Sequence, residues 1–168
     1  MTLTTHSGRL VNPLDLRVED IDIEDIAHAL ANLNRFGGHT KFPISVATHS
    51  IHVSMLCPDH PLDGLLHDAA EAYLVDIPRD LKAEVIMAGY RDAETRAQLV
   101  IAEKFDLCLE MPLDVLEADA LMGRVEFERG FGIEASVPDA PLVFPVKWDV
   151  AKFRFLEVYR ALMAGAKI

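Results

Sequence analysis

The fragment LLHDAAE at positions 65–71 contains the residues best suited to carry chemistry. It sets a histidine and two carboxylates among leucines and alanines, in a segment whose apolar pattern indicates burial. Burying an ionised carboxylate costs on the order of several kcal/mol unless it is paired or bound to a metal. Imidazole nitrogen together with carboxylate oxygen suits a divalent ion such as Mn, Co, Zn, Ni, Fe or Mg. We therefore expect His67 and Asp68 to help bind one divalent metal per chain.

Two further residues are candidate ligands because helical spacing turns them toward the interior. His49 lies on the apolar stripe of a predicted helix over 45–57, and Asp119 lies between apolar positions of a predicted helix over 112–128. An acid in such a position is not a plain surface residue. The candidate metal ligands are therefore His49, His67, Asp68 and Asp119.

The elements that must position these residues are helices, since apolar residues recur at helical spacing over most of the chain and strand signals are scarce. The predicted helices cover residues 23–34, 45–57, 62–74, 78–88, 91–105, 112–128 and 148–164. Gly89 is expected to stop the fourth helix, and the Gly- and Pro-containing stretch 130–145 is expected to be a loop. With 168 residues, the chain is expected to be one all-α domain over 1–168, a compact bundle of about six to seven helices.

The composition excludes some classes of partner. A formal net charge of −11 disfavours binding of long nucleic acid, but a bound cation can reverse the local charge for a small phosphorylated metabolite. No apolar run approaches the roughly 18 residues of a membrane span, and the N-terminal residues lack a secretory signal. We therefore expect a cytoplasmic protein with no membrane partner. Cys57 and Cys108 belong to no metal or redox motif and are expected to be buried.

Taken together, the motifs resemble those of the HD phosphohydrolase superfamily. A histidine is followed after about eighteen residues by His-Asp, and after about fifty more by a lone Asp. The string HDAAEAYLVDIPRDLK resembles the bacterial 5′-deoxynucleotidases and the phage-type HD triphosphohydrolases that act on dATP. The string NRFGGHTKFPISVATHS also resembles the latter group. The resemblance spans about residues 22–128 and implies an HD-domain helical bundle, the same four metal ligands, and a homo-oligomer.

The resemblance also implies roles for residues around the metal. Glu71, one helical turn beyond His67, would be the acid/base, and Asp76 would orient the water or the sugar. Arg35 and Lys82 would bind phosphate oxygens. One position departs from the pattern: many relatives have Glu before the first ligand histidine, where this chain has Thr48, and this puts a contact behind that ligand in doubt.

Two more residues, His39 and Lys41, are candidates for substrate contact only because they share a loop with Arg35. An exposed loop position without a role is an equally good interpretation of both.

The predicted function is hydrolysis of a deoxynucleoside phosphate, favoured as a dATP-type triphosphohydrolase that releases triphosphate. The sequence has no Walker loop, GxGxxG, GxSxG or plausible cysteine nucleophile, which leaves a metal-activated water. The alternatives are a 5′-deoxynucleotidase that acts on dNMPs and a non-catalytic, nucleotide-sensing HD module. Retention of Glu71 disfavours the sensing module, because binding alone needs no water-activating acid.

Overall fold

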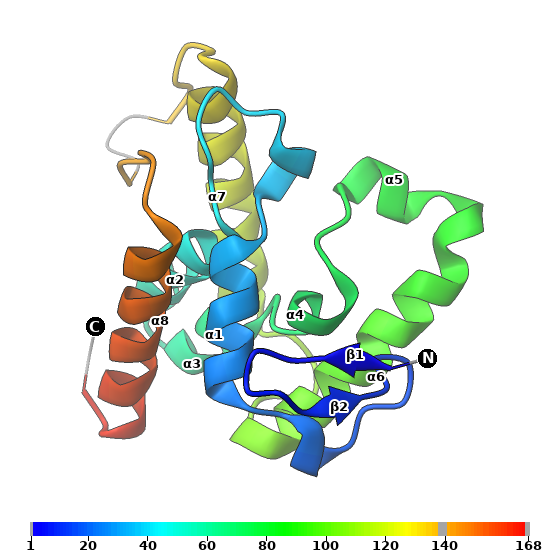
Figure 1. The fold of residues 1–168 in the computed structure, drawn as a ribbon. Coiled ribbons are helices and arrows are strands. Elements are labelled where there is room, and N and C mark those ends of the chain that lie inside the picture. The colour runs from blue at the N-terminus through cyan, green and yellow to red at the C-terminus, as the bar shows by residue number, and fades with distance from the viewer. Residues whose placement is uncertain (1, 138–140, 167–168) are drawn as a thin grey trace.

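Helices form the framework of the structure, a computed structural model that describes residues 2–137 and 141–166 (Figure 1). The α-helices are α1 (Ile23–Asn32), α2 (Val46–Leu56), α3 (Pro61–Leu66), α4 (Glu71–Leu74), α5 (Arg79–Ala83), α6 (Ala88–Phe105), α7 (Leu113–Phe131) and α8 (Trp148–Met163). Short 3-10 helices are η1 (Val18–Asp20), η2 (Arg35–Gly38) and η3 (Val85–Met87), and β1 (Leu3–Thr4) pairs antiparallel with β2 (Leu10–Val11). The predicted all-α class is confirmed.

The core is built around α1, which packs against α2, α4 and α8 (Figure 1). Asp22 caps this helix by accepting a hydrogen bond from the Glu24 N–H, so the helix starts where its buried stripe starts. Ile26 and Leu30 are fully buried in the same cluster as Phe155 of α8. Helix α2 also packs against α3 and α7. These contacts bring together the three segments that carry the candidate ligands: α2, the end of α3 and α7.

The predicted helices 23–34, 45–57 and 148–164 match α1, α2 and α8 to within two residues at each end. The helix predicted over 112–128 is α7, which extends three residues further, to Phe131. Gly132 caps its end with a φ of 69°, a value that suits glycine. The expected loop 130–145 therefore begins at Gly132, and its residues 138–140 lie outside the described part of the chain.

Two helix predictions were wrong. The segment 62–74 is not continuous, because turns at residues 67–70 separate α3 from α4. The segment 78–88 breaks at Glu84, which has an extended backbone, and Gly89 does not stop a helix but lies in the first turn of α6. The first N–H groups of a helix need no intrahelical acceptor, so a glycine there interrupts nothing.

Cys57 is buried, as predicted, but the prediction for Cys108 was wrong because that residue is exposed in the connection between α6 and α7. Within the described ranges, no helix combines the length and the apolar character that crossing a membrane would require.

Gly64 allows α3 to lie unusually close to α2. A Cβ atom at this buried position would overlap the Cys57 sulfur and would lie 3.0 Å from the Ser54 Cα. The Ser54 hydroxyl also donates a hydrogen bond to the Pro61 carbonyl at 2.6 Å. Because a helix backbone cannot move aside as a flexible side chain can, only glycine fits here.

We expect Gly64→Ala to lower the free energy of unfolding by about 1–3 kcal/mol, because the added methyl group overpacks the α2–α3 contact. Gly89→Ala is the matched control: a Cβ there meets nothing within 4 Å, so it should be neutral or stabilising by up to about 1 kcal/mol. Urea denaturation of both variants measures the difference. Equal stability of Gly64→Ala and the parent chain would contradict this account of the close approach.

Candidate metal centre and adjoining pockets

The four predicted ligands come together from three segments: α2, the turn between α3 and α4, and α7. The donor atoms of His49, His67 and Asp68 all lie within 4.8 Å of one another. The Oδ1 atom of Asp119 lies 3.1 Å from His49 Nε2 and 3.9 Å from His67 Nε2. The Asp68 Oδ2 atom lies 3.1 Å and 3.8 Å from the Nε2 atoms of His67 and His49. Four residues separated by up to 70 positions therefore share one centre.

The orientation of the His67 ring is set by one hydrogen bond to the main chain. Its Nδ1 atom lies 2.8 Å from the Gly64 carbonyl oxygen, which can only accept, so Nδ1 carries the proton. In the neutral ring, Nε2 then presents a lone pair. This atom is buried and forms no hydrogen bond, although Asp68 Oδ2 is close to it. A lone pair that faces carboxylate oxygens is repelled by them, and a metal cation between them would remove that repulsion.

His49 shows the same arrangement. Its Nδ1 atom lies 3.0 Å from Oε2 of Glu126 on α7, so the ring donates to that carboxylate and turns Nε2 toward Asp119. Burial opposes the charged form of His49, yet the carboxylates of Glu126 and Asp119 raise its pKa above the ordinary histidine value. The carboxylates around His49 therefore favour a positive charge on this ring.

A divalent cation fits this donor set. Two imidazole nitrogens and two carboxylate oxygens suit Mn, Fe, Co, Ni or Zn, and each histidine has its other nitrogen bonded to an acceptor, as metal-bound histidines usually do. The unpartnered His67 Nε2 is the atom that such a cation would satisfy.

Glu126 is a site residue that the sequence analysis missed. It is fully buried, and its Oε2 atom lies 2.8 Å from Arg35 Nε as well as next to His49. Its spacing from Asp119 carried a usable signal, because positions 119, 122 and 126 lie on one helical stripe. Thr48 faces Ser45, with 2.9 Å between the two hydroxyl oxygens, so the carboxylate that orients His49 comes from α7.

Glu71 and Lys82 form a pair beside the metal centre. Lys82 Nζ lies 3.4 Å from Glu71 Oε1 and 2.6 Å from Glu94 Oε1. Burial and the carboxylates of Asp68 and Asp76 raise the pKa of Glu71 to about 10, which favours its protonated form. Burial also raises the pKa of Asp76.

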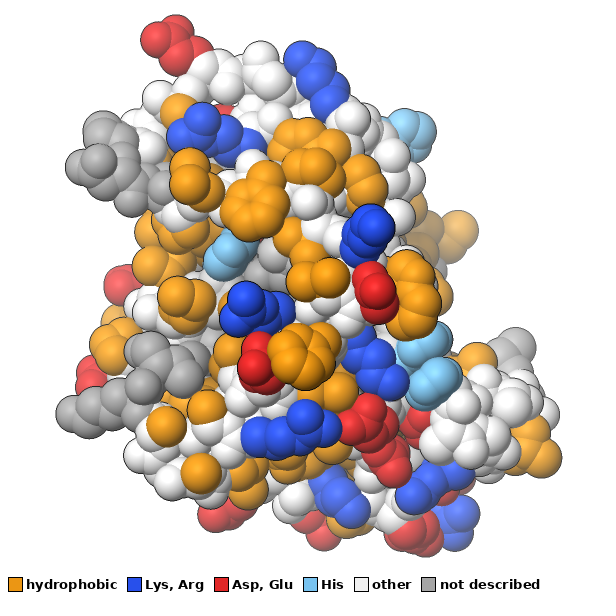
Figure 2. Space-filling view, turned by 60° about the vertical axis from the view of Figure 1, so that its left-hand side comes forward, with side chains coloured by type: hydrophobic (Ala, Val, Ile, Leu, Met, Phe, Trp, Pro, Cys, Tyr) orange, Lys and Arg blue, Asp and Glu red, His pale blue; other side chains and the backbone are white. Residues whose placement is uncertain are grey.

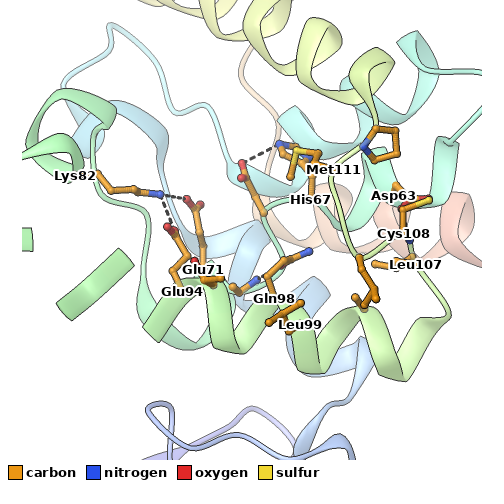
Figure 3. Close-up of a pocket in the computed structure, with 16 residues that line it drawn as sticks. Asp63, His67, Glu71, Lys82, Glu94, Gln98, Leu99, Leu107, Cys108 and Met111 are labelled. Atoms are coloured by element: carbon orange, nitrogen blue, oxygen red, sulfur yellow. Dashed lines mark hydrogen bonds and ion pairs between the residues drawn. The ribbon is translucent and has the colours of Figure 1, made fainter. Parts of the chain in front are cut away.

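Two pockets meet at Asp68, Glu71 and Lys82. One, the α6 pocket, has a volume of about 300 Å³. Figure 3 shows Lys82 and Glu94 at one end of it and apolar side chains, including Leu107 and Met111, toward the other. The second, the basic pocket, has a volume of about 380 Å³. Its wall combines four carboxyl groups with four cationic side chains, and the cations are Arg35, Arg79, Lys82 and Arg124.

Two predicted substrate contacts do not lie at this site. His39 is exposed at the end of η2 and lines neither pocket. The Lys41 side chain lies over Gly132 at the end of α7, thirteen residues beyond Asp119, or roughly 20 Å along the helix axis. Instead, Arg79 approaches the centre, with its Nη2 atom 2.9 Å from Asp119 Oδ2, a contact that the sequence analysis did not anticipate.

Comparison with known proteins places the chain in a family. It is 37% identical over 133 residues to the uncharacterized protein YfdR of Escherichia coli K12, a match that covers 79% of this chain and 73% of YfdR. This chain belongs to the YfdR family. A second relative, the uncharacterized protein RCAP_rcc00048 of Rhodobacter capsulatus, is 35% identical over 147 residues, which cover 79% of this chain and 74% of that protein. No family model matches the chain.

We expect this member of the YfdR family to bind close to one divalent metal per chain, because four ligands converge on one centre. Replacement of both His67 and Asp68 by Ala should abolish binding, whereas His39→Ala, at an exposed histidine outside the centre, should leave it unchanged. Elemental analysis of purified protein, followed by titration with Mn²⁺ or Co²⁺, measures both. Absence of metal from the parent chain together with no binding in the titration would rule the centre out.

Proposed function

We propose that the protein is a metal-dependent phosphohydrolase that acts on deoxynucleoside phosphates, with a deoxynucleoside triphosphate as the favoured substrate and triphosphate as the product. The observation that carries this proposal is the basic pocket, which opens directly on Asp68 and Asp119 of the candidate metal centre. Cationic side chains beside a divalent metal form a site for a phosphorylated molecule.

The charge of the basic pocket supports a polyphosphate. Three arginines and a lysine line this hollow beside four carboxyl groups, so the metal ion would add the positive charge that a polyphosphate needs. A triphosphate carries several negative charges and offers oxygens to each of these donors, whereas a single phosphate would engage fewer of them. The pocket therefore suits a triphosphate chain better than a monophosphate.

The α6 pocket suits the nucleoside part. It shares three residues with the basic pocket, and its lining also includes apolar side chains such as Leu99 and Met111 (Figure 3). A nucleoside in the α6 pocket and a polyphosphate in the basic pocket would bring the phosphorus that joins them next to the metal centre. The proposed cleavage is at that phosphorus, which accounts for release of intact triphosphate.

A divalent cation held by His49, His67, Asp68 and Asp119 would supply hydroxide near neutral pH and polarise a phosphoryl oxygen. Glu71 carries a proton and lies beside the centre, so it is placed to donate that proton to the leaving oxygen. Arg35 is held in place by Glu126 and faces the basic pocket, where it binds phosphate oxygens. Lys82 reaches both pockets and binds the phosphate nearest the sugar.

The resemblance of these same residues to the HD phosphohydrolases supports the proposal independently of the pockets. The residues to which the resemblance assigns metal binding, acid/base catalysis and phosphate binding all lie at the candidate metal centre or in the two pockets beside it.

We also propose that the protein is a cytoplasmic homo-oligomer. The face shown in Figure 2 carries hydrophobic side chains dispersed among charged ones, and Trp148, Val150 and Phe153 of α8 are exposed. Burying them against a second copy would remove apolar surface from water. A light-scattering mass near the 18.6 kDa of one chain would contradict this assembly.

A screen of dNTPs, dNMPs and their ribose forms with Mn²⁺ or Co²⁺ tests the activity, with phosphate and triphosphate detected separately. We expect triphosphate from a dNTP, with purines favoured. Glu71→Gln should keep the metal but lower kcat by roughly 10²-fold or more, because it removes the proton donor. Glu103→Gln, at an exposed site on α6, is the control.

Each outcome of the screen has a distinct meaning. Phosphate released from dNMPs would identify a 5′-deoxynucleotidase instead. Nucleotide binding without turnover would identify a sensing module, and full activity of Glu71→Gln would remove that residue from the mechanism.

A further inference from the structure

The helix that carries the His-Asp pair is interrupted by a side chain from another helix. Between α3 and α4, Gln98 of α6 donates from Nε2 to the Leu66 carbonyl at 2.8 Å and accepts from the Ala70 N–H at 3.3 Å. In an unbroken α-helix, the N–H of residue 70 would bond directly to the carbonyl of residue 66. The Gln98 amide thus replaces one hydrogen bond of the helix with two of its own.

The orientation of this amide is fixed by its partners. A carbonyl can only accept and a backbone N–H can only donate, so the amide nitrogen of Gln98 must face Leu66 and its oxygen must face Ala70. Leu66 and Ala70 are both buried, so a carbonyl or N–H group left unpaired there would be costly. The interruption is therefore a specific contact.

A second main-chain carbonyl near this turn, that of Gly64, also accepts a hydrogen bond from a side chain. The Gly64 oxygen, which would accept from the Asp68 N–H in an α-helix, accepts from His67 Nδ1 instead. The main chain responds with shorter-range bonds, from the Ala69 N–H to Leu66 and from the Glu71 N–H to Asp68. Such a turn has about 3.0 residues per turn instead of 3.6, which changes the direction of successive side chains by roughly 20° per residue.

This difference matters because the other two ligands are on separate helices. His49 lies on α2 and Asp119 on α7. The directions of the His67 and Asp68 side chains relative to these two residues therefore depend on the backbone conformation of the turn at residues 67–70. If the Ala70 N–H bonded directly to the Leu66 carbonyl, as in a continuous α-helix, both side chains would rotate relative to His49 and Asp119.

Gln98 belongs to a row of similar contacts along α6. One turn before it, Glu94 binds Lys82, and one turn earlier the Tyr90 hydroxyl donates to the Val75 carbonyl at 2.6 Å. Val75 has a φ of 69°, which is costly for a β-branched residue, and it lies between Glu71 and Asp76. Positions 90, 94 and 98 lie on one face of α6, so this face holds the whole segment that carries the site.

We propose that Gln98 is a positioning residue that holds the turn at residues 67–70 in the geometry by which His67 and Asp68 bind the metal. This inference rests on the proposed metal centre. It assigns to Gln98 an effect on metal affinity and coordination that goes beyond its contribution to folding.

The test compares two variants of α6 in the full chain. Gln98→Met removes both hydrogen bonds at similar volume. Val100→Ala is the control, since Val100 is also partly buried on α6 and packs on the main core, and its apolar side chain forms no hydrogen bond with the turn. Thermal unfolding of the chelator-treated proteins measures stability, and Co²⁺ titration followed by the visible absorption of the bound ion measures affinity and coordination.

We expect Gln98→Met to weaken Co²⁺ binding about 10- to 100-fold, as loss of a group that orients a ligand typically does, and to alter the Co²⁺ spectrum. Val100→Ala should lower the unfolding temperature and leave both Co²⁺ readouts unchanged. Gln98→Leu also removes both hydrogen bonds, so it should weaken Co²⁺ binding in the same way, and it serves as the readout if Gln98→Met does not fold.

Two results would overturn the inference, and they are distinguishable. If the parent chain binds Co²⁺ and the Gln98 variants bind it with the same affinity and spectrum, Gln98 has only a structural role and the metal centre stands. If the parent chain binds no Co²⁺, the metal centre fails and the role of Gln98 fails with it.

Discussion

The hydrogen bond from His67 to the Gly64 carbonyl determines the character of the site, because a carbonyl can only accept. It places the ring proton on Nδ1 and so turns the Nε2 lone pair toward Asp68 and Asp119. Gly64 is also the residue that lets α3 approach α2, which brings His67 within reach of His49. The packing of α3 on α2 and the tautomer of His67, a candidate ligand, thus both depend on Gly64.

The electrostatic balance of the site follows from this arrangement. Four carboxyl groups line the basic pocket beside the centre, and the raised pKa of Glu71 favours the uncharged form of one of them. Arg35 and Glu126 form a buried ion pair behind His49, which keeps that arginine beside the centre without adding net charge. The cost of taking two charges out of water offsets much of the attraction in such a pair, so it is weak evidence for stability. The remaining cations face the basic pocket, where an anionic molecule could meet them.

The parts predicted from the sequence are those that depend on residue type and local periodicity. The four candidate ligands are histidines and aspartates among apolar residues, and the structure brings all four together, although His67 and Asp68 lie in a turn. The break at residues 67–70 could not be predicted, because Gln98 lies 32 positions from Leu66 and only the tertiary fold joins them. The same limit applies to Lys41, whose distance from the site depends on the path of a loop.

The backbone on both sides of Glu71 is irregular. Turns precede α4, and the strained Val75 follows it, so this single helical turn is separated on both sides from regular structure. Strained conformations persist only where the surroundings over-determine them. Here those surroundings are side chains of α6, which bond to the main chain before and after α4. The positions of Glu71 and of the His-Asp pair are therefore governed by a helix that contributes no candidate ligand.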